Sequence, residues 1–127
     1  EIVTLASVIE GEAGSDADRP LVSSVFHNRL NSATYPYLES CATVQYILGE
    51  RKPILSNSDI QIKSPYNTYI NKGLPLGPIC SPGKASIEAA LYPSDTDYYF
   101  FQSDAAGKLY YSKTLAEHER KKNEIQQ

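Results

Sequence analysis

The most informative segment of the chain is Ile2-Val-Thr-Leu-Ala-Ser-Val-Ile-Glu-Gly-Glu-Ala-Gly14. It combines the clearest helical pattern of the chain with its most informative acids. Its apolar residues recur at helical spacing and form one stripe, which predicts a helix over residues 1–14 with one face in the core. Gly14 is of the residue type that commonly ends a helix. Two glutamates, Glu10 and Glu12, lie near the C-terminal end of this helix.

The two glutamates differ in their expected surroundings. Two positions apart on a helix, Glu10 and Glu12 point about 160° away from each other and do not easily serve one cleft together. Glu12 follows three apolar residues on its own side of the helix, Leu5, Val8 and Ile9. Desolvation there would raise the pKa of its carboxyl group, as a general acid requires near neutral pH. Glu12 is therefore the candidate acid and Glu10 a candidate second acid, although two solvated glutamates at a helix end would show the same spacing.

The remaining sequence predicts short elements around a long irregular middle. The expected elements are a helix from Ser15 or Asp18 to about residue 31, one or two helical turns at 44–48, a helix at 83–91, strands at 98–101 and 108–111 around a turn at 103–107, and a last helix that begins at the capping pattern Thr114-x-x-Glu117. This order predicts an α+β fold in a single domain over residues 1–127, with helices around a cleft and a small C-terminal hairpin, broadly like lysozyme.

Composition excludes several classes of function. The chain of 127 residues is 41% apolar and 21% charged, which suits one globular domain with a single core. Its net charge of -3 gives no basic surface for a nucleic-acid backbone, so nucleic acid is not an expected partner. No apolar run approaches the roughly 18 residues of a membrane span. Without a Cys/His ligand cluster, we expect no metal site and no cofactor.

The irregular middle contains a second candidate site, in the segment Ser64-Pro-Tyr-Asn-Thr-Tyr69. Prolines there and in the following residues 72–79 stiffen an extended path, and glycines allow another chain to approach closely. Hydroxyl and amide groups beside aromatic faces suit a groove for a glycan. A packed loop without a ligand would have the same composition.

Taken together, the motifs resemble those of the catalytic domain of the endolytic murein transglycosylases, the YceG-like family. The resemblance covers almost the whole chain. It is carried by Leu5-Ala-Ser-Val-Ile-Glu-Gly-Glu-Ala13, Val25-Phe-His-Asn-Arg-Leu30, Thr43-Val-Gln-Tyr46, Ser64-Pro-Tyr-Asn-Thr-Tyr69, Gly73-Leu-Pro-Leu-Gly-Pro-Ile79, Ser81-Pro-Gly-Lys-Ala-Ser-Ile-Glu-Ala-Ala90, Tyr99-Phe-Phe101 and Ser112-Lys-Thr-Leu-Ala-Glu-His118.

The resemblance also implies roles for single residues. The catalytic glutamate of the family matches Glu12, in agreement with the helical argument, and the first acid of the motif matches Glu10. The substrate-binding residues that it implies are Asn28, Glu39, Ser40, Thr43, Tyr66, Asn67, Thr68 and Tyr69.

Two cysteines depart from the family pattern. Cys41 and Cys80 stand where relatives usually have other residues, in two loops that the resemblance places close together. They allow one intrachain pairing. Family members work outside the cytoplasmic membrane, where thiols can oxidise, so the resemblance implies a disulfide between Cys41 and Cys80. Two free thiols are the alternative.

The resemblance implies non-hydrolytic cleavage of peptidoglycan at the β-1,4 link between N-acetylmuramic acid and N-acetylglucosamine. One acid protonates the leaving oxygen, and the same group then takes the proton of the muramic C6 hydroxyl, which closes on C1 to leave a 1,6-anhydro end. One glutamate suffices, while Asp59 and Glu39 stay open as second acids. A hydrolase of the muramidase or spore-cortex type and a catalytically silent peptidoglycan-binding module remain alternatives.

The family also carries an N-terminal membrane helix and a further small domain, neither of which is found in this sequence. We therefore expect an excised catalytic domain that is monomeric and does not itself span a membrane. The resemblance further implies a full-length protein at the extracytoplasmic face of the bacterial membrane, with glycan strands as substrate and cell-wall synthases as partners.

Overall fold

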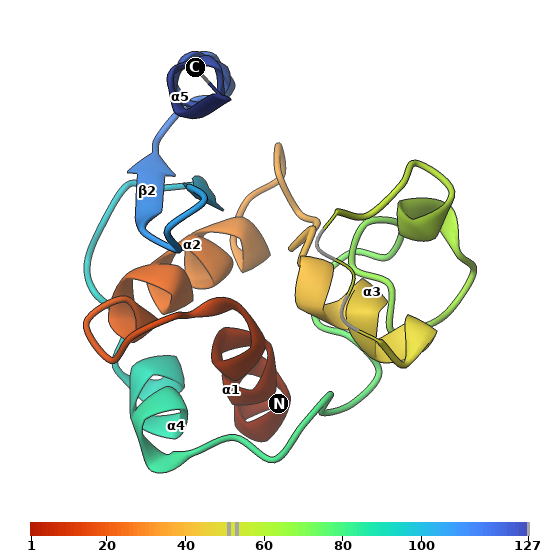
Figure 1. Ribbon diagram of the computed structural model, residues 1–127. Coiled ribbons are helices and arrows are strands. Elements are labelled where there is room, and N and C mark those ends of the chain that lie inside the picture. Colours follow the sequence, from red (N-terminus) through yellow and green to blue (C-terminus); the bar gives the residue numbers. More distant parts are fainter. Residues whose placement is uncertain (51, 53, 127) are drawn as a thin grey trace.

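A computed structural model describes residues 1–50, 52 and 54–126 and confirms the α+β class. Figure 1 shows α1, α2 and α4 packed together, with α3 and its following loop to one side and the hairpin and α5 above. The elements are α1 (Ile2–Glu12), α2 (Arg19–Leu30), α3 (Cys41–Leu48), η1 (Asp59–Gln61), α4 (Lys84–Leu91), β1 (Phe100–Ser103), β2 (Leu109–Ser112) and α5 (Leu115–Gln126). No helix among these described residues is long and apolar enough to cross a membrane.

Helix α1 is the centre of the core. Its apolar stripe is buried and packs against α4, α2 and α3. The core cluster consists of Leu5, Ala6, Val8, Ile9, Val22, Phe26, Leu38 and Ala90. The helix ends at Glu12, two residues before Gly14, because Ala13 has already turned to extended backbone at φ -81° and ψ 135°. Glu12 is therefore the last helical residue, at the edge of the core.

Close contact between α1 and α3 depends on Gly11. A Cβ atom at this position would lie 2.7 Å from the Cβ of Ala42. Real Cβ atoms do not approach this closely, so any side chain would push α3 away from the end of α1. The glycine between Glu10 and Glu12 thus allows the first turn of α3 to pack beside the predicted acid.

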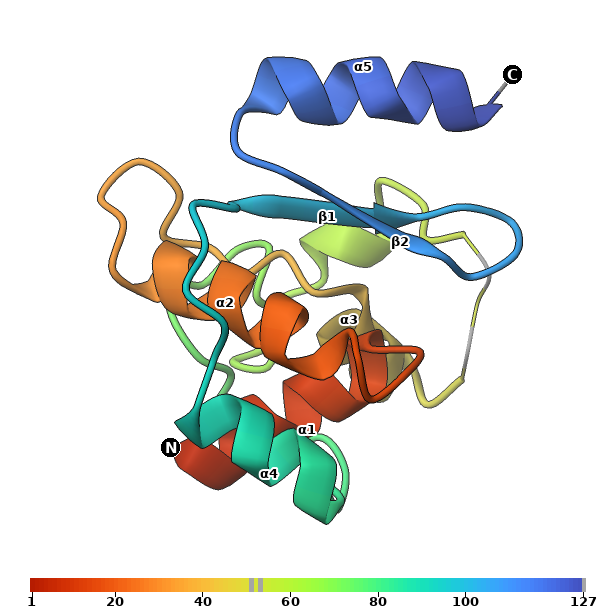
Figure 2. The same ribbon diagram turned by 90° about the vertical axis from the view of Figure 1, so that its left-hand side faces the viewer.

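The hairpin begins later than its sequence pattern predicts. Strand β1 covers Phe100–Ser103 and not 98–101, and it pairs antiparallel with β2, Phe100 opposite Ser112. The carbonyls of Tyr98 and Tyr99 instead accept hydrogen bonds from Asn28 and Arg29 of α2. The chain before β1 is therefore bonded to a helix. Two views agree that the hairpin lies between α2 and α5 (Figures 1 and 2).

The cap of the last helix is confirmed. Thr114 Oγ1 accepts a hydrogen bond from the backbone N–H of Glu117 at 3.1 Å, as a capping box requires. The Glu117 carboxylate bonds back to the N–H of Lys113, one residue earlier than the standard pattern. These contacts fix the start of α5 directly after β2.

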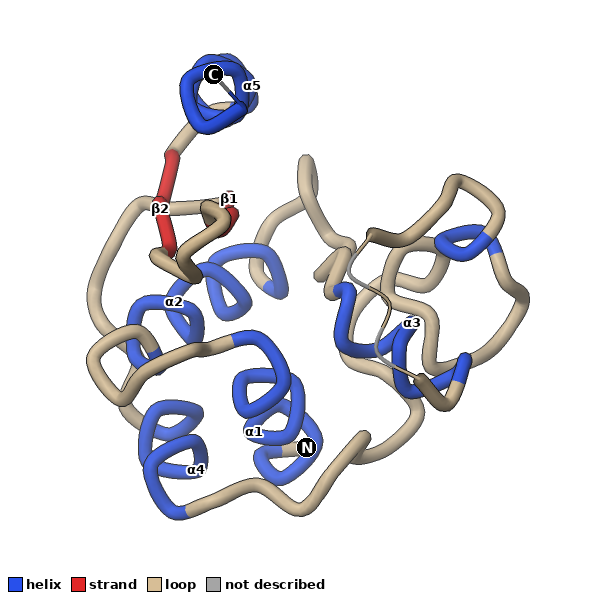
Figure 3. Tube along the Cα trace, in the orientation of Figure 1, coloured by secondary structure: helices blue, strands red, loops and turns tan. Residues whose placement is uncertain are grey.

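Between α3 and α4, the described chain is mostly loop (Figure 3), as the irregular sequence predicts. Gly49 ends α3 in the left-handed region at φ +74°, as expected of a helix-stopping glycine. Asn67 organises the loop from inside: its Nδ2 donates to the carbonyls of Ile60 and Ile62, and its Oδ1 accepts from the N–H of Tyr69. A buried amide here replaces the missing regular backbone hydrogen bonds.

Candidate active site

A cleft of about 780 Å³ lies where the C-terminal end of α1 meets the hairpin, α5 and the segment before α3. Its size suits a ligand of several sugar-like groups, since ligand pockets commonly measure roughly 300–1,000 Å³. Five of the residues singled out from the sequence line it: Glu10, Glu12, Glu39, Cys41 and Tyr69. The cleft therefore brings together the helix 1 acids and part of the predicted binding segments.

Glu12 lies beside Cys41 and Tyr69 in this cleft. Burial raises the pKa of the Tyr69 hydroxyl, and the neighbouring Cys41 and then the Glu12 carboxylate raise it further. Burial likewise raises the pKa of the Cys41 thiol, with a contribution from Glu12. The Glu12 carboxylate is thus within electrostatic reach of two polar groups from other elements, where a bound substrate would also meet it.

Glu10 also lines the cleft, but its carboxylate is bonded to α4. Oε1 accepts hydrogen bonds from the N–H of Gly83 at 2.8 Å and from Ser86 Oγ at 3.0 Å, while Oε2 pairs with Arg19 at 3.1 Å. These contacts, the Gly83 N–H first, lower the pKa of Glu10. The group is kept ionised at the N-terminus of a helix, which argues against a role as second acid.

Replacing Glu10 is expected to lower the stability of the protein. Glu10→Ala removes the anion at the N-terminus of α4 and should lower the free energy of unfolding by about 1 kcal/mol at neutral pH. Because the folded pKa is depressed, the charge stabilises the protein above the ordinary glutamate value of 4.5, and this contribution is lost as pH falls through the folded pKa. Urea unfolding of wild type and Glu10→Gln should therefore show a difference that shrinks below pH 4.5. A difference that grows in acid would contradict this role.

Glu39 is brought to the cleft by an unusual backbone. Among the described non-glycine residues it is the one with positive φ, at +50°. Its carboxylate lies 3.9 Å from Nη1 of Arg29, and its side chain is 52% exposed. Residues held in such sparsely populated conformations are often found at functional sites. Glu39 thus keeps its predicted place in the candidate site.

Arg29 connects three walls of the cleft. Its Nε donates to the carbonyl of Tyr99 and its Nη1 to the carbonyl of Tyr37, both at 2.6 Å. The guanidinium carbon lies 4.9 Å from the ring centroid of Phe100. Burial lowers the pKa of the guanidinium, and Glu39 opposes this shift. Arg29 is 5% exposed and therefore joins α2, the segment before α3 and β1 from inside.

Four of the predicted substrate-binding residues lie inside the protein. Ser40 and Asn67 are 0% exposed, as is Thr43, and Thr68 is 1% exposed. Thr68 Oγ1 accepts from the N–H of Ser40 and shares a hydrogen bond with Thr43 Oγ1 at 2.9 Å. Direct contact of these four side chains with a glycan is therefore not supported by the structure. They hold the loop that presents Tyr69.

Three further residues that were predicted for the site make their contacts outside the cleft. Asn28 donates to the carbonyls of Thr96 and Tyr98, and so fixes the chain before β1. The ring of Tyr66 lies against that of Tyr46, with 5.0 Å between centroids. Asp59 is bonded to Lys52 and Ser56, which lower its pKa. None of these predicted residues is among the described residues that line the cleft.

The predicted disulfide is wrong for this structure, because Cys41 and Cys80 are both free thiols. Cys41 Sγ lies 3.2 Å from the hydroxyl of Tyr69, in the cleft. Cys80 Sγ instead donates a weak hydrogen bond to the carbonyl of Ser7, in the middle of α1. The two sulfurs thus have different partners: Cys41, the first residue of α3, lies beside Tyr69, whereas Cys80 contacts α1.

Sequence reasoning missed the wall formed by the hairpin and α5. The sequence pattern predicts Tyr99 and Phe100 as strand residues and α5 as the last helix, without a site role for either. The cleft is also lined by His118, Glu119 and Lys122 of α5. Their helical spacing indicates that they share one side of the helix. The sequence does not show that β1 and β2 place this helix over the end of α1. No cluster of metal-ligating residues occurs among the described residues.

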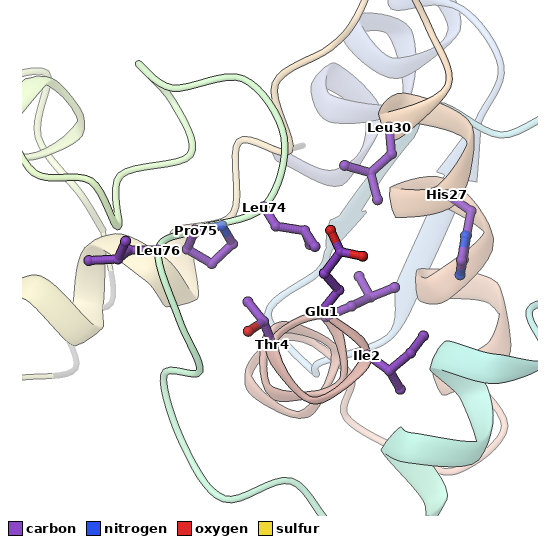
Figure 4. A pocket seen from close by; sticks show the side chains of 9 residues that line it. Glu1, Ile2, Thr4, His27, Leu30, Leu74, Pro75 and Leu76 are labelled. Carbon is purple, nitrogen blue, oxygen red and sulfur yellow. The ribbon is translucent and has the colours of Figure 1, made fainter.

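A second cavity, of about 660 Å³, lies between the start of α1, the end of α2 and the loop at 74–76 (Figure 4). The carboxylate of Glu1 points into it between Leu30 and Leu74. Its described lining is otherwise largely apolar and contains none of the residues predicted to form a site. The cleft around Glu12 is therefore the candidate active site.

Comparison with known proteins agrees with this assignment. The family model described as the YceG-like family matches residues 1–124. An endolytic murein transglycosylase of Bacillus subtilis strain 168 is 44% identical over 122 residues, and one of Streptococcus pneumoniae D39 is 36% identical over 126 residues. These alignments cover 96% and 94% of this chain, but 33% and 22% of the relatives. The chain thus spans a third or less of those proteins.

A solved structure has the same fold. The crystal structure of a yceG-like protein from Listeria monocytogenes, determined at 2.6 Å, superposes with a TM-score of 0.86 at 48% sequence identity. The match covers 94% of this chain and 38% of the solved chain.

Proposed function

This chain belongs to the YceG-like family, and on that premise we propose that it is an endolytic transglycosylase that cleaves the glycan strands of peptidoglycan. The scissile bond is the β-1,4 link from N-acetylmuramic acid to N-acetylglucosamine. The product is a 1,6-anhydro end on the muramic residue. Two relatives are named endolytic murein transglycosylases, and this supports the reaction class.

Glu12 performs both proton transfers of the proposed reaction. Its carboxyl proton passes to the glycosidic oxygen as the bond from C1 to that oxygen breaks. The C6 hydroxyl oxygen of the same muramic residue then bonds to C1, and its proton returns to the Glu12 carboxylate. Atoms balance without water, because the two products together are an isomer of the strand that was cut.

The observation that carries this proposal is that the acidic side chains make different contacts. Glu10 and Glu12 both line the cleft, but the Glu10 carboxylate accepts hydrogen bonds from Gly83 and Ser86, while Glu12 lies beside Tyr69 and Cys41. Asp59 is bonded to Lys52 outside the described cleft lining. A transglycosylase needs one carboxyl group that acts as acid and then as base. A glycoside hydrolase of the usual kind needs two.

The rest of the cleft suits a sugar polymer. Tyr69 and Tyr99 line it with aromatic groups, and aromatic faces pack on the apolar faces of sugar rings. The cleft is about 780 Å³ and only partly enclosed by protein, so a strand can pass through and be cut within its length. These features support endolytic action on a polymer.

Glu39 favours one alternative, a hydrolase of the same bond. Its carboxylate lies in the same cleft as Glu12 and could activate a water molecule for attack on C1. The ion pair with Arg29 favours a binding role for Glu39 instead, because it holds the carboxylate against the cleft wall.

The proposal is tested by digesting purified glycan strands and analysing the new ends by mass spectrometry. We expect internal fragments with anhydro ends, each lighter by one water than a hydrolysed end. Reducing ends would support the hydrolase, and intact strands a binding module. Since the substrate lies outside the cytoplasmic membrane, we further propose that the full-length protein acts at the extracytoplasmic face, on strands supplied by cell-wall synthases.

A further inference from the structure

Helix α5 forms one wall of the candidate active site. Four of its side chains, Leu115, His118, Glu119 and Lys122, line the same cleft as Glu12. Their positions correspond to i, i+3, i+4 and i+7, and therefore lie on one face of the helix. This continuous face is turned toward the cavity in which the proposed reaction takes place.

His118 and Lys121 attach α5 to the hairpin. Gln102 Nε2 donates to the carbonyl of His118 at 3.0 Å, and the His118 ring stacks on Phe100 with 5.1 Å between centroids. The ammonium group of Lys121 lies 4.4 Å from the ring centroid of Tyr110. Figure 2 shows α5 extending along the hairpin as a separate layer. Because His118 and Lys121 make these contacts, Glu119 and Lys122 remain for contacts with a ligand.

The charges on this face are not neutralised by the described part of the protein. Glu119 and Lys122 are exposed, and neither forms an ion pair with another described residue. The other cation of the described cleft lining, Arg29, is 5% exposed and bonded to backbone carbonyls. Lys122 is therefore the cation that a ligand in the cleft can reach from solvent.

A neutral glycan backbone offers no charge that would pair with this wall. The sugar rings of peptidoglycan offer hydroxyl, N-acetyl and apolar surfaces, whereas ionised groups are concentrated on the peptide stem attached to each muramic residue. We propose that the α5 face is a subsite for the peptide stem, in which Lys122 binds a stem carboxylate and Glu119 faces a stem ammonium group. This inference rests on the proposed function and names the part of the substrate that α5 recognises.

The subsite is tested with two substrates, glycan strands that carry peptide stems and strands from which the stems have been removed. Lys122→Ala should lower kcat/KM about two- to fivefold on stem-bearing strands, the range expected for one exposed charge pair. Lys122→Glu should lower it by about tenfold, because repulsion replaces attraction. On stem-free strands both variants should match wild type. Arg120→Ala is the matched control, since Arg120 is an exposed cation of α5 outside the described cleft lining.

Binding gives a second measurement that does not depend on cleavage. In a Glu12→Gln background, the Kd for stem-bearing strands should rise with Lys122→Ala by the same factor. This difference between parent and variant should shrink at high salt, because salt screens the attraction that Lys122 supplies. Equal losses on both strands, or a loss no greater than that of Arg120→Ala, would overturn the subsite. If wild type cleaves neither strand, the proposed function fails, while the binding measurement still decides whether α5 recognises the stem.

Discussion

Glu12→Gln is expected to abolish glycan cleavage while the protein stays folded. The amide keeps the size of the side chain but can neither protonate the glycosidic oxygen nor accept the C6 hydroxyl proton. Removing a general acid typically costs about 10²- to 10⁴-fold, and here one group performs both transfers, so we expect a loss of at least about a thousandfold in kcat. The rate of anhydro-end formation on purified strands, followed by mass spectrometry, measures this loss.

The matched control for Glu12→Gln is Glu10→Gln, two residues earlier on the same helix. Its carboxylate is bonded to Gly83 and Ser86 of α4, so its loss should leave cleavage near the wild-type rate. Both variants should unfold within about 1 kcal/mol of wild type, because each is an isosteric change of a partly exposed side chain. If Glu12→Gln cleaved normally and Glu10→Gln did not, the assignment of the acid would be reversed.

Asn67→Ala is expected to destabilise the protein strongly. The Asn67 side chain is 0% exposed, and its loss would leave the carbonyls of Ile60 and Ile62 and the N–H of Tyr69 without their partner. Leaving buried polar groups unsatisfied costs about 1–3 kcal/mol each, partly relieved by relaxation of the loop. We therefore expect the free energy of unfolding in urea to fall by about 3 kcal/mol, with kcat of the folded protein much less affected.

Asn71→Ala is the control for this prediction. Asn71 lies on the same loop and its Nδ2 also donates to two carbonyls, those of Ser64 and Asn67, but the residue is exposed. Water can replace its contacts, so the loss should stay below about 1 kcal/mol. A large fall in turnover with unchanged stability in Asn67→Ala would instead show that this side chain contacts the glycan directly.

The helical part of the fold could be predicted because its signals are local. The periodicity of α1 places Ile9 in the core, and the same helical geometry separates Glu10 from Glu12. The contacts of the two side chains differ as expected, because Glu10 is bonded to α4 while Glu12 lies beside Tyr69. Both glutamates nevertheless line the same cleft, which corrects the expectation that they would not share one. A helix of known period fixes the directions of its side chains without any knowledge of tertiary contacts.

The loop was harder to interpret, because polar residue types suit two opposite environments. Asn67 and Thr68 have the composition of a binding loop, yet both are buried. In a segment with little regular structure, side-chain amides and hydroxyls must satisfy backbone groups that helices and strands would otherwise pair. Sequence composition alone does not distinguish that internal role from contact with a glycan.

The far wall of the site depends on long-range contacts that no local pattern reveals. Arg29 is an ordinary cation in the sequence, but in the structure it binds carbonyls of Tyr37 and Tyr99 and holds two walls together. The α5 face reaches the cleft only because the hairpin crosses α2 and carries the helix with it. Such placement follows from the packing of distant segments.

In the proposed reaction one carboxyl group, that of Glu12, cuts the strand without consuming water. Digestion of purified glycan strands in water enriched in heavy oxygen, followed by mass spectrometry of the new ends, tests it most directly. If Glu12 acts in this way, the anhydro ends will contain no heavy oxygen, because the muramic C6 hydroxyl supplies the oxygen that bonds to C1. New reducing ends that carry heavy oxygen at C1 would contradict it and show that the enzyme is a hydrolase.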